Sequence, residues 1–100
     1  MRSKYERKAQ KILEEDGYLV DFKIRPSSFR VPRGYMVDFF GLFDLCAYKL
    51  NNPLRWISIK GRAGIPSTHR QAIEAFKIPL GNIKEIWSFS KKRVKQEIID

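Results

Sequence analysis

Apolar side chains recur at helical spacing near the start of the chain. The stripe consists of Tyr5, Ala9, Ile12 and Leu13, which share one face of a helix because positions three or four apart are neighbours there. Ser3-x-x-Glu6 has the form of a capping box, and Gly17 favours a helix end. The pattern therefore predicts an amphipathic helix over residues 3–16.

A second stripe of the same spacing occurs after the middle of the chain. It consists of Ala72, Ile73 and Phe76. Thr68-x-x-Gln71 has capping-box form at its start, and Pro79 follows it. Proline favours a helix end because it lacks the backbone N–H that a helix interior needs. We predict a helix over residues 68–78.

Four shorter segments have the patterns of β-strands. Residues 18–24 alternate between apolar and polar side chains, and so do residues 55–60, where Trp56, Ser58 and Lys60 share one face. The other two segments are apolar runs. The four predicted strands span residues 18–24, 43–50, 55–60 and 83–89. The basic segment over residues 91–99 predicts a short helix.

The order of these elements favours one α/β domain over residues 1–100. The first three predicted strands can form a meander, whereas the fourth follows a helix and has to pair through a crossover. The result is a small mixed β-sheet flanked by helices. A chain of 100 residues has room for one such core.

The chain carries a strong positive charge. Twenty Lys and Arg residues oppose eleven Asp and Glu residues, for a formal net charge of +9. A field of that sign attracts polyanions, so nucleic acid is the first partner to consider. The basic residues are spread along the chain rather than gathered on one amphipathic segment, which argues against a membrane surface.

Cysteine usage and hydropathy bear on the compartment. Cys46 is the only cysteine and lies in an apolar run, so we expect a buried free thiol. No apolar run approaches the length that spans a bilayer, and no secretory signal is present. We expect a soluble, cytoplasmic protein without a membrane partner.

Two charged residues fall at the same end of the predicted hairpin. With a turn at residues 51–53, Asp44 near the start of one strand comes close to Lys60 near the end of the other. A carboxylate beside an amine can hold a hard cation and stabilise charge on a phosphate. From spacing alone, the same two residues are better explained as a partly exposed ion pair that adds little stability.

Three short motifs occur in order along the chain. The first runs from Tyr5-Glu6-Arg7 to the Gly17-Tyr18 strand start, the second is Gly41-Leu42-Phe43-Asp44-Leu45-Cys46-Ala47, and the third is Ile57-Ser58-Ile59-Lys60-Gly61-Arg62. Together they resemble the PD-(D/E)XK nucleases, and within them the archaeal Holliday-junction resolvases and related phage and bacterial proteins. The resemblance covers about residues 3–90 and implies the αβββαβ core of restriction-endonuclease-like proteins.

The resemblance implies a role for several residues. Asp44 matches the central metal-binding aspartate, Lys60 the catalytic lysine, and Glu6 the glutamate of the first helix that contacts the metal directly or through water. The implied cofactor is Mg²⁺ or Mn²⁺, and the backbone carbonyl of Ile59 is expected to face it. Glu6 also suits an ordinary role, since it completes the capping box with Ser3.

Ser58 departs from the family pattern because it stands where the second carboxylate belongs. Serine is neutral, so its presence weakens cation binding. Three explanations stay open: the acidic role has moved to Glu74 on the next helix, Ser58 holds a metal-bound water, or the site is dead and the protein only binds DNA. Glu74 also suits a solvated helix surface, and Asp38 suits an exposed loop.

Several arginines are candidates for contact with DNA. They are Arg25, Arg30 and Arg33 in the loop after the first strand, and Arg62 and Arg70 near Lys60. His69 is the only histidine and has no metal-ligating neighbour in the sequence, so we expect it to contact phosphate or solvent. No recognition-helix pattern is present, which favours binding through the DNA backbone and shape.

The leading hypothesis is a metal-dependent endonuclease that cuts branched or structured DNA. The resemblance implies a homodimer with two sites, and the apolar run over residues 39–43 suits either the core or such an interface. The alternatives are a catalytically degraded DNA-binding module on the same fold, and a basic RNA- or protein-interaction domain.

Overall fold

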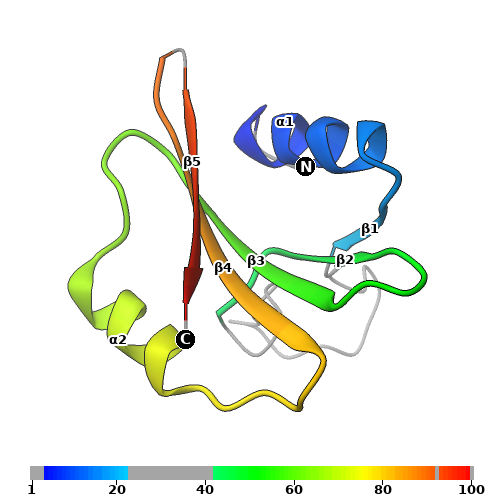
Figure 1. Ribbon diagram of the computed structural model, residues 1–100. Coiled ribbons are helices and arrows are strands. Elements are labelled where there is room, and N and C mark those ends of the chain that lie inside the picture. Colours follow the sequence, from blue (N-terminus) through cyan, green and yellow to red (C-terminus); the bar gives the residue numbers. More distant parts are fainter. Residues whose placement is uncertain (1–3, 23–41, 92, 100) are drawn as a thin grey trace, which may run out of the picture.

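The strands of the described residues form one sheet, with a helix on each face. The computed structural model describes residues 4–22, 42–91 and 93–99. The elements are α1 (Lys4–Glu15), β1 (Leu19–Phe22), β2 (Leu45–Tyr48), β3 (Leu54–Lys60), α2 (Ser67–Ala75), β4 (Asn82–Phe89) and β5 (Val94–Ile99). The sheet has the order β1-β2-β3-β4-β5, with β3 and β4 parallel and all other neighbours antiparallel. Figure 1 shows α1 and α2 on opposite sides of this sheet, so the predicted small mixed sheet flanked by helices is confirmed.

The last element is a strand, and the helix predicted over residues 91–99 is wrong. β5 pairs with β4 from Phe89↔Val94 to Lys84↔Ile99. The turn between them is closed by the Ser90 N–H, which donates to the Arg93 carbonyl over 2.9 Å. Pairing with β4 satisfies the backbone groups of this segment and buries Ile99, whereas a short isolated helix is only marginally stable, so tertiary context overrides local propensity.

The helix ends confirm one sequence signal and contradict another. Gly17 has φ +92°, and its N–H donates to Glu14 while the Tyr18 N–H donates to Leu13, which is the Schellman pattern of a glycine stop. At α2 the N-cap is Pro66 without a side-chain hydrogen bond, so the capping box predicted at Thr68 is wrong. Ser3, of the other predicted capping box, lies outside the described residues.

The two faces of the sheet carry separate apolar clusters. The cluster under α1 contains Ala9, Leu13, Phe22, Leu45, Ala47, Ile57, Ile59, Trp87 and Phe89, and the cluster under α2 contains Phe43, Ile73, Ile86 and Ile99. Ile57 and Ile59 therefore face α1. The alternate side chains of β3, Trp56, Ser58 and Lys60, share the other face, as the sequence pattern predicted, and this face is covered by α2.

Within the part of the chain that the structure describes, neither helix has the length and apolarity required to cross a membrane.

Candidate active site

Asp44 lies immediately before β2 and bonds to the end of β3. Its backbone N–H donates to the Ile57 carbonyl over 2.9 Å, and its Oδ2 accepts a hydrogen bond of 2.6 Å from the Ile59 N–H. Ile59 stands between Ser58 and Lys60 in the chain. The fold therefore places the Asp44 carboxylate within one residue of both, at the end of the sheet where β3 stops.

Lys60 is held by the only histidine. Lys60 Nζ lies 3.4 Å from His69 Nδ1, and His69 Nε2 lies 3.3 Å from the Leu42 carbonyl oxygen. A neutral imidazole with its proton on Nε2 satisfies both contacts, because Nε2–H donates to Leu42 while Nδ1 accepts from the ammonium. His69 thus ties α2 to β3 and to the segment before Asp44. Sequence reasoning assigned it to phosphate or solvent, and no spacing in the chain indicated its contact with Lys60.

Ser58 is completely buried on the α2 side of β3. Its exposed fraction is 0%, and its Oγ has no hydrogen-bond partner among the described residues. A buried hydroxyl without a partner costs free energy, so this position is not explained by stability alone. The neutral side chain beside Asp44 leaves the carboxylate without a second anionic neighbour on β3.

The first turn of α1 reaches the same end of the sheet from the other side. A Cβ on Gly61 would lie 2.8 Å from Tyr5 Cε2, so only glycine allows this close approach after Lys60. Glu6 follows Tyr5 and is half-buried. It lies on α1, which covers the face of the sheet opposite α2 and His69.

Glu74 is placed away from this group. Arg70 Nε lies 3.3 Å from Glu74 Oε2, and the Arg70 guanidinium also forms a bidentate ion pair with Glu97 of β5. Arg70 lowers the pKa of the Glu97 carboxyl. Glu74 lines a hollow of about 550 Å³ together with Asn82, at the end of the sheet opposite Lys60. Glu74 therefore does not lie beside Asp44. Arg70, a predicted DNA contact, is paired with two carboxylates.

The buried carboxylate of Glu85 also lies outside the candidate site. Glu85 accepts two hydrogen bonds from Arg55, at 2.6 and 2.8 Å, and one of 2.8 Å from Trp87 Nε1. This bonding raises the pKa of Arg55 further above its usual value, with the hydrogen bond to Glu85 as the largest cause. Both charges are used in joining β3 to β4, so the pair is structural.

The described residues supply only part of the metal site that the resemblance implies. Asp44 offers hard oxygen ligands, whereas Ser58 adds no charge. Among residues 4–22, 42–91 and 93–99, no group of three or more His, Cys, Asp or Glu side chains is placed to hold an ion. Arg25, Arg30, Arg33 and Asp38 lie outside the described residues, and Arg62 is exposed directly after β3.

Comparison with known proteins adds no relative: no protein-family model, curated sequence or solved structure matches this chain. The Asp44 carboxylate, bound to the backbone next to Lys60, and the Lys60 ammonium suit a phosphate ester and an attacking water better than an apolar ligand.

Proposed function

We propose that this protein is a DNA endonuclease that hydrolyses a phosphodiester at the Asp44–Lys60 end of the sheet. The observation that carries the proposal is the hydrogen bond from the Ile59 N–H to the Asp44 carboxylate, which fixes that carboxylate one residue from Lys60. The net charge of +9 favours a polyanionic substrate. Branched DNA is the proposed substrate, and a symmetric dimer would present two such sites to two strands.

Each side chain has a defined task in the proposed reaction. Lys60, oriented by His69, places an ammonium where negative charge develops on the phosphate. Asp44, oriented by the Ile59 amide, is the described residue that would hold Mg²⁺ or Mn²⁺. Such an ion, when bound, supplies Lewis-acid activation of water.

The test uses a labelled four-way DNA junction, a duplex of the same sequence, and Mn²⁺. We expect junction cleavage that falls at least about 100-fold in Asp44→Ala and Lys60→Ala, in line with the loss of a charge-stabilising group. Circular dichroism would establish that both variants keep their fold. Cleavage that persists undiminished in Asp44→Ala removes the proposed site.

Glu74→Ala is the matched acidic control. Because Glu74 is paired with Arg70 at the surface, we expect its removal to change the cleavage rate less than about twofold, as for a charge away from the reacting atoms. A loss as large as that of Asp44→Ala would instead assign the missing carboxylate to α2.

A second candidate function is DNA binding without hydrolysis, and Ser58 is the observation that favours it. The hydroxyl is neutral and buried beside Asp44. Ser58→Asp restores a carboxylate of small volume, and Ser58→Ala is its control. Cleavage that arises only in Ser58→Asp would show a binding module with a degraded site, whereas cleavage by the unaltered protein supports the first proposal.

A further inference from the structure

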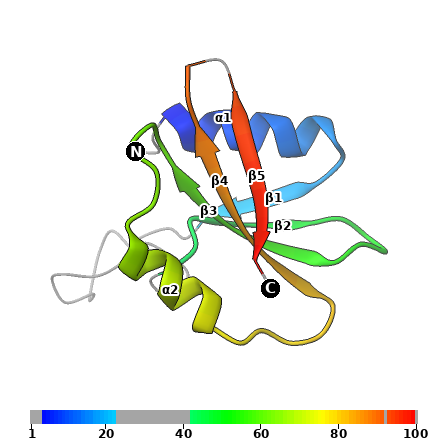
Figure 2. The ribbon, with the colours of Figure 1, turned by 60° about the vertical axis from the view of Figure 1, so that its left-hand side comes forward.

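A cationic groove of about 310 Å³ lies between α1 and the turn that joins β4 to β5. Lys8 and Lys11 of α1 form one wall, and Lys91 and Arg93 of the turn form the other. Lys8 and Lys11 are three residues apart and therefore lie on one side of the helix. In Figure 2 α1 crosses behind β4 and β5 close to this turn.

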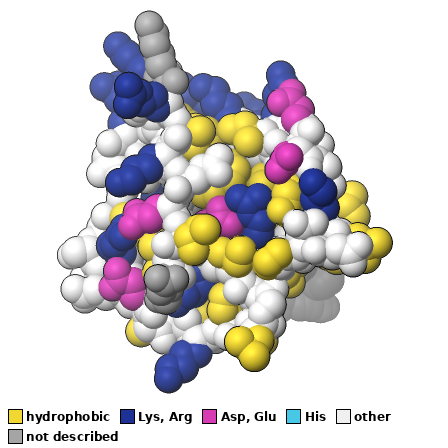
Figure 3. All heavy atoms as spheres, in the orientation of Figure 1, with side chains coloured by type: hydrophobic (Ala, Val, Ile, Leu, Met, Phe, Trp, Pro, Cys, Tyr) yellow, Lys and Arg dark blue, Asp and Glu magenta, His cyan; other side chains and the backbone are white. Residues whose placement is uncertain are grey.

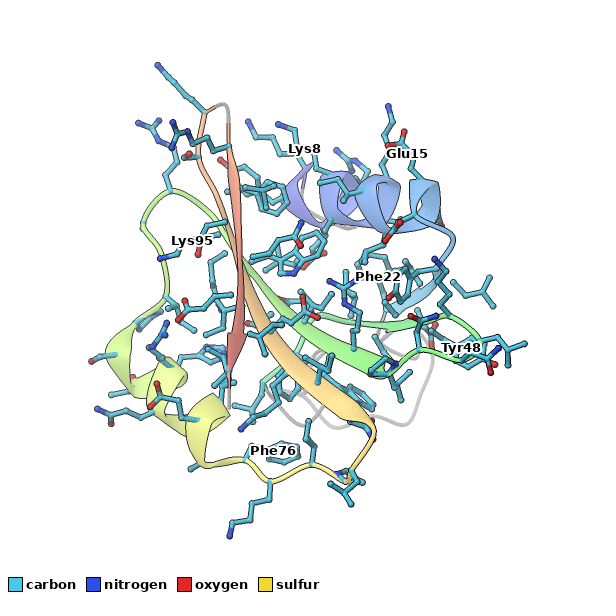
Figure 4. The ribbon with its side chains drawn as sticks, viewed as in Figure 1. Lys8, Glu15, Phe22, Tyr48, Phe76 and Lys95 are labelled. Atoms are coloured by element: carbon cyan, nitrogen blue, oxygen red, sulfur yellow. The ribbon has the colours of Figure 1, made fainter. Side chains whose placement is uncertain are left out.

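The charge of the groove is unbalanced. Its lining holds four cations and a single acid, Glu15. None of the four cations takes part in the ion pairs that the structure records among its described residues, which are those of Arg55 and Arg70. All four are exposed. Figure 3 shows the dark-blue Lys and Arg side chains gathered over this end of the molecule, and Figure 4 shows Lys8 and Glu15 projecting from α1.

The floor of the groove is formed by apolar side chains that are buried or partly buried, Phe89, Ile12 and Val94. Phe89 is 4% exposed and stacks on Tyr5 at a centroid distance of 5.4 Å. The exposed large apolar side chains of the described residues, Leu19, Tyr48, Leu50, Leu80 and Ile98, lie outside it. An amphipathic lipid-binding face would combine charge with exposed apolar side chains, so this arrangement fits a polyanion rather than a membrane.

The groove lies at the same end of the sheet as the candidate active site. Lys60 pairs with Ser88, one residue before Phe89 on the parallel strand. Tyr5 touches Gly61 on one side and stacks on Phe89 on the other, so it connects the two places. The groove is on the α1 side and Lys60 faces α2, so a DNA strand would have to pass around this end of the sheet to meet both.

We propose that the groove binds the phosphate backbone of a duplex DNA arm and leads it toward Asp44 and Lys60. The choice of DNA rests on the proposed function, but the groove itself is a separate site. Its contacts are ionic and carry no sequence information, because Lys and Arg side chains here meet phosphates rather than base edges.

The test is a salt titration of DNA binding by fluorescence anisotropy, without divalent cations. The variants are Lys8→Gln, Lys11→Gln, Lys91→Gln and Arg93→Gln, and Lys77→Gln is the matched control, since Lys77 is exposed but lies after α2. Each groove variant should reduce the slope of log affinity against log salt by about 0.9, the value for one phosphate contact. Lys77→Gln should leave the slope unchanged.

Three results would overturn the groove. One is a slope that falls equally in the groove variants and in Lys77→Gln. Another is a slope that every groove variant leaves unchanged. The third is groove-dependent binding that is tighter to duplex RNA or to phosphatidylglycerol vesicles than to duplex DNA. If the slopes change as expected but the unaltered protein cuts no junction in Mn²⁺, the endonuclease proposal fails and the groove stands.

Discussion

Cys46 and Asp21 lie opposite each other on β2 and β1. The thiol is free and half-buried rather than fully buried. Burial raises its pKa to about 11, and the Asp21 carboxylate adds to the rise. Both causes disfavour the thiolate, so Cys46 stays protonated at neutral pH and is a poor nucleophile.

Alkylation by iodoacetamide tests this environment. At pH 8, Cys46 in the folded protein should react about 100-fold more slowly than in urea, where an unperturbed thiol has a pKa near 8.5. The pKa of Cys46 is higher in the folded protein than in the unfolded chain. The protonated thiol therefore contributes to stability below about pH 9, and this contribution is lost as the pH rises toward about 11. Asp21→Asn should lower the thiol pKa, whereas Asp16→Asn, at an exposed site outside β1, should leave it unchanged. Equal rates in folded and unfolded protein contradict the assignment.

At the scale of an element, a buried lysine on the sheet forms hydrogen bonds to the end of α2. Lys84 on β4 is 5% exposed, and its Nζ donates to the carbonyls of Ile73, Glu74 and Phe76 over 2.7, 3.1 and 2.8 Å. These carbonyls belong to the end of α2, where a helix has unsatisfied acceptors and partial negative charge. The ammonium therefore uses all three of its donors to hold the helix end in place.

Lys84→Met should lower the free energy of unfolding by about 2–4 kcal/mol, because charged hydrogen bonds are lost and buried carbonyls at the end of α2 are left without donors. The measurement is urea unfolding followed by circular dichroism. Lys77→Met is the control at an exposed neighbouring position, where we expect a change within about 0.5 kcal/mol. A loss below about 1 kcal/mol in Lys84→Met means that water replaces the ammonium without penalty.

At the scale of the whole molecule, one sheet forms part of two cores. Trp87 lies in the cluster under α1, whereas Trp56 packs against the cluster under α2 and donates to Asn82 Oδ1 over 2.8 Å. β3 and β4 contribute side chains to both clusters, and Arg55 and Glu85 join these two strands. Because both apolar clusters include side chains of β3 and β4, disruption of these two strands would expose both clusters to water. The shared strands therefore favour a single cooperative unfolding transition.

The two tryptophans report separately on the two layers. In Trp56→Phe the remaining fluorescence comes from the α1 side, and in Trp87→Phe it comes from the α2 side. In each variant the urea midpoint from fluorescence should coincide with that from circular dichroism. A fluorescence midpoint that precedes the circular dichroism midpoint in one variant would show that its layer unfolds first.

Local chemistry fixed the features that the sequence alone predicted. The glycine stop at Gly17, the alternation along β3 and the position of Asp44 against the end of β3 depend on dihedral preference, side-chain period and a short hairpin. These signals act within a few residues, so they are readable in order along the chain. The mixed sheet with a helix on each face follows from the order of those elements.

Tertiary structure alone decided what depends on partners far apart in the chain. β5 is a strand because β4 offers its backbone edge, Lys84 is buried because α2 ends above it, and His69 meets Lys60 because α2 folds back over β3. The same folding directs Arg70 toward Glu97 of β5 and brings α1 against the β4–β5 turn to form the groove. Hydrogen bonds and ion pairs across such separations depend on how the layers pack, and periodicity along the chain carries no record of that packing.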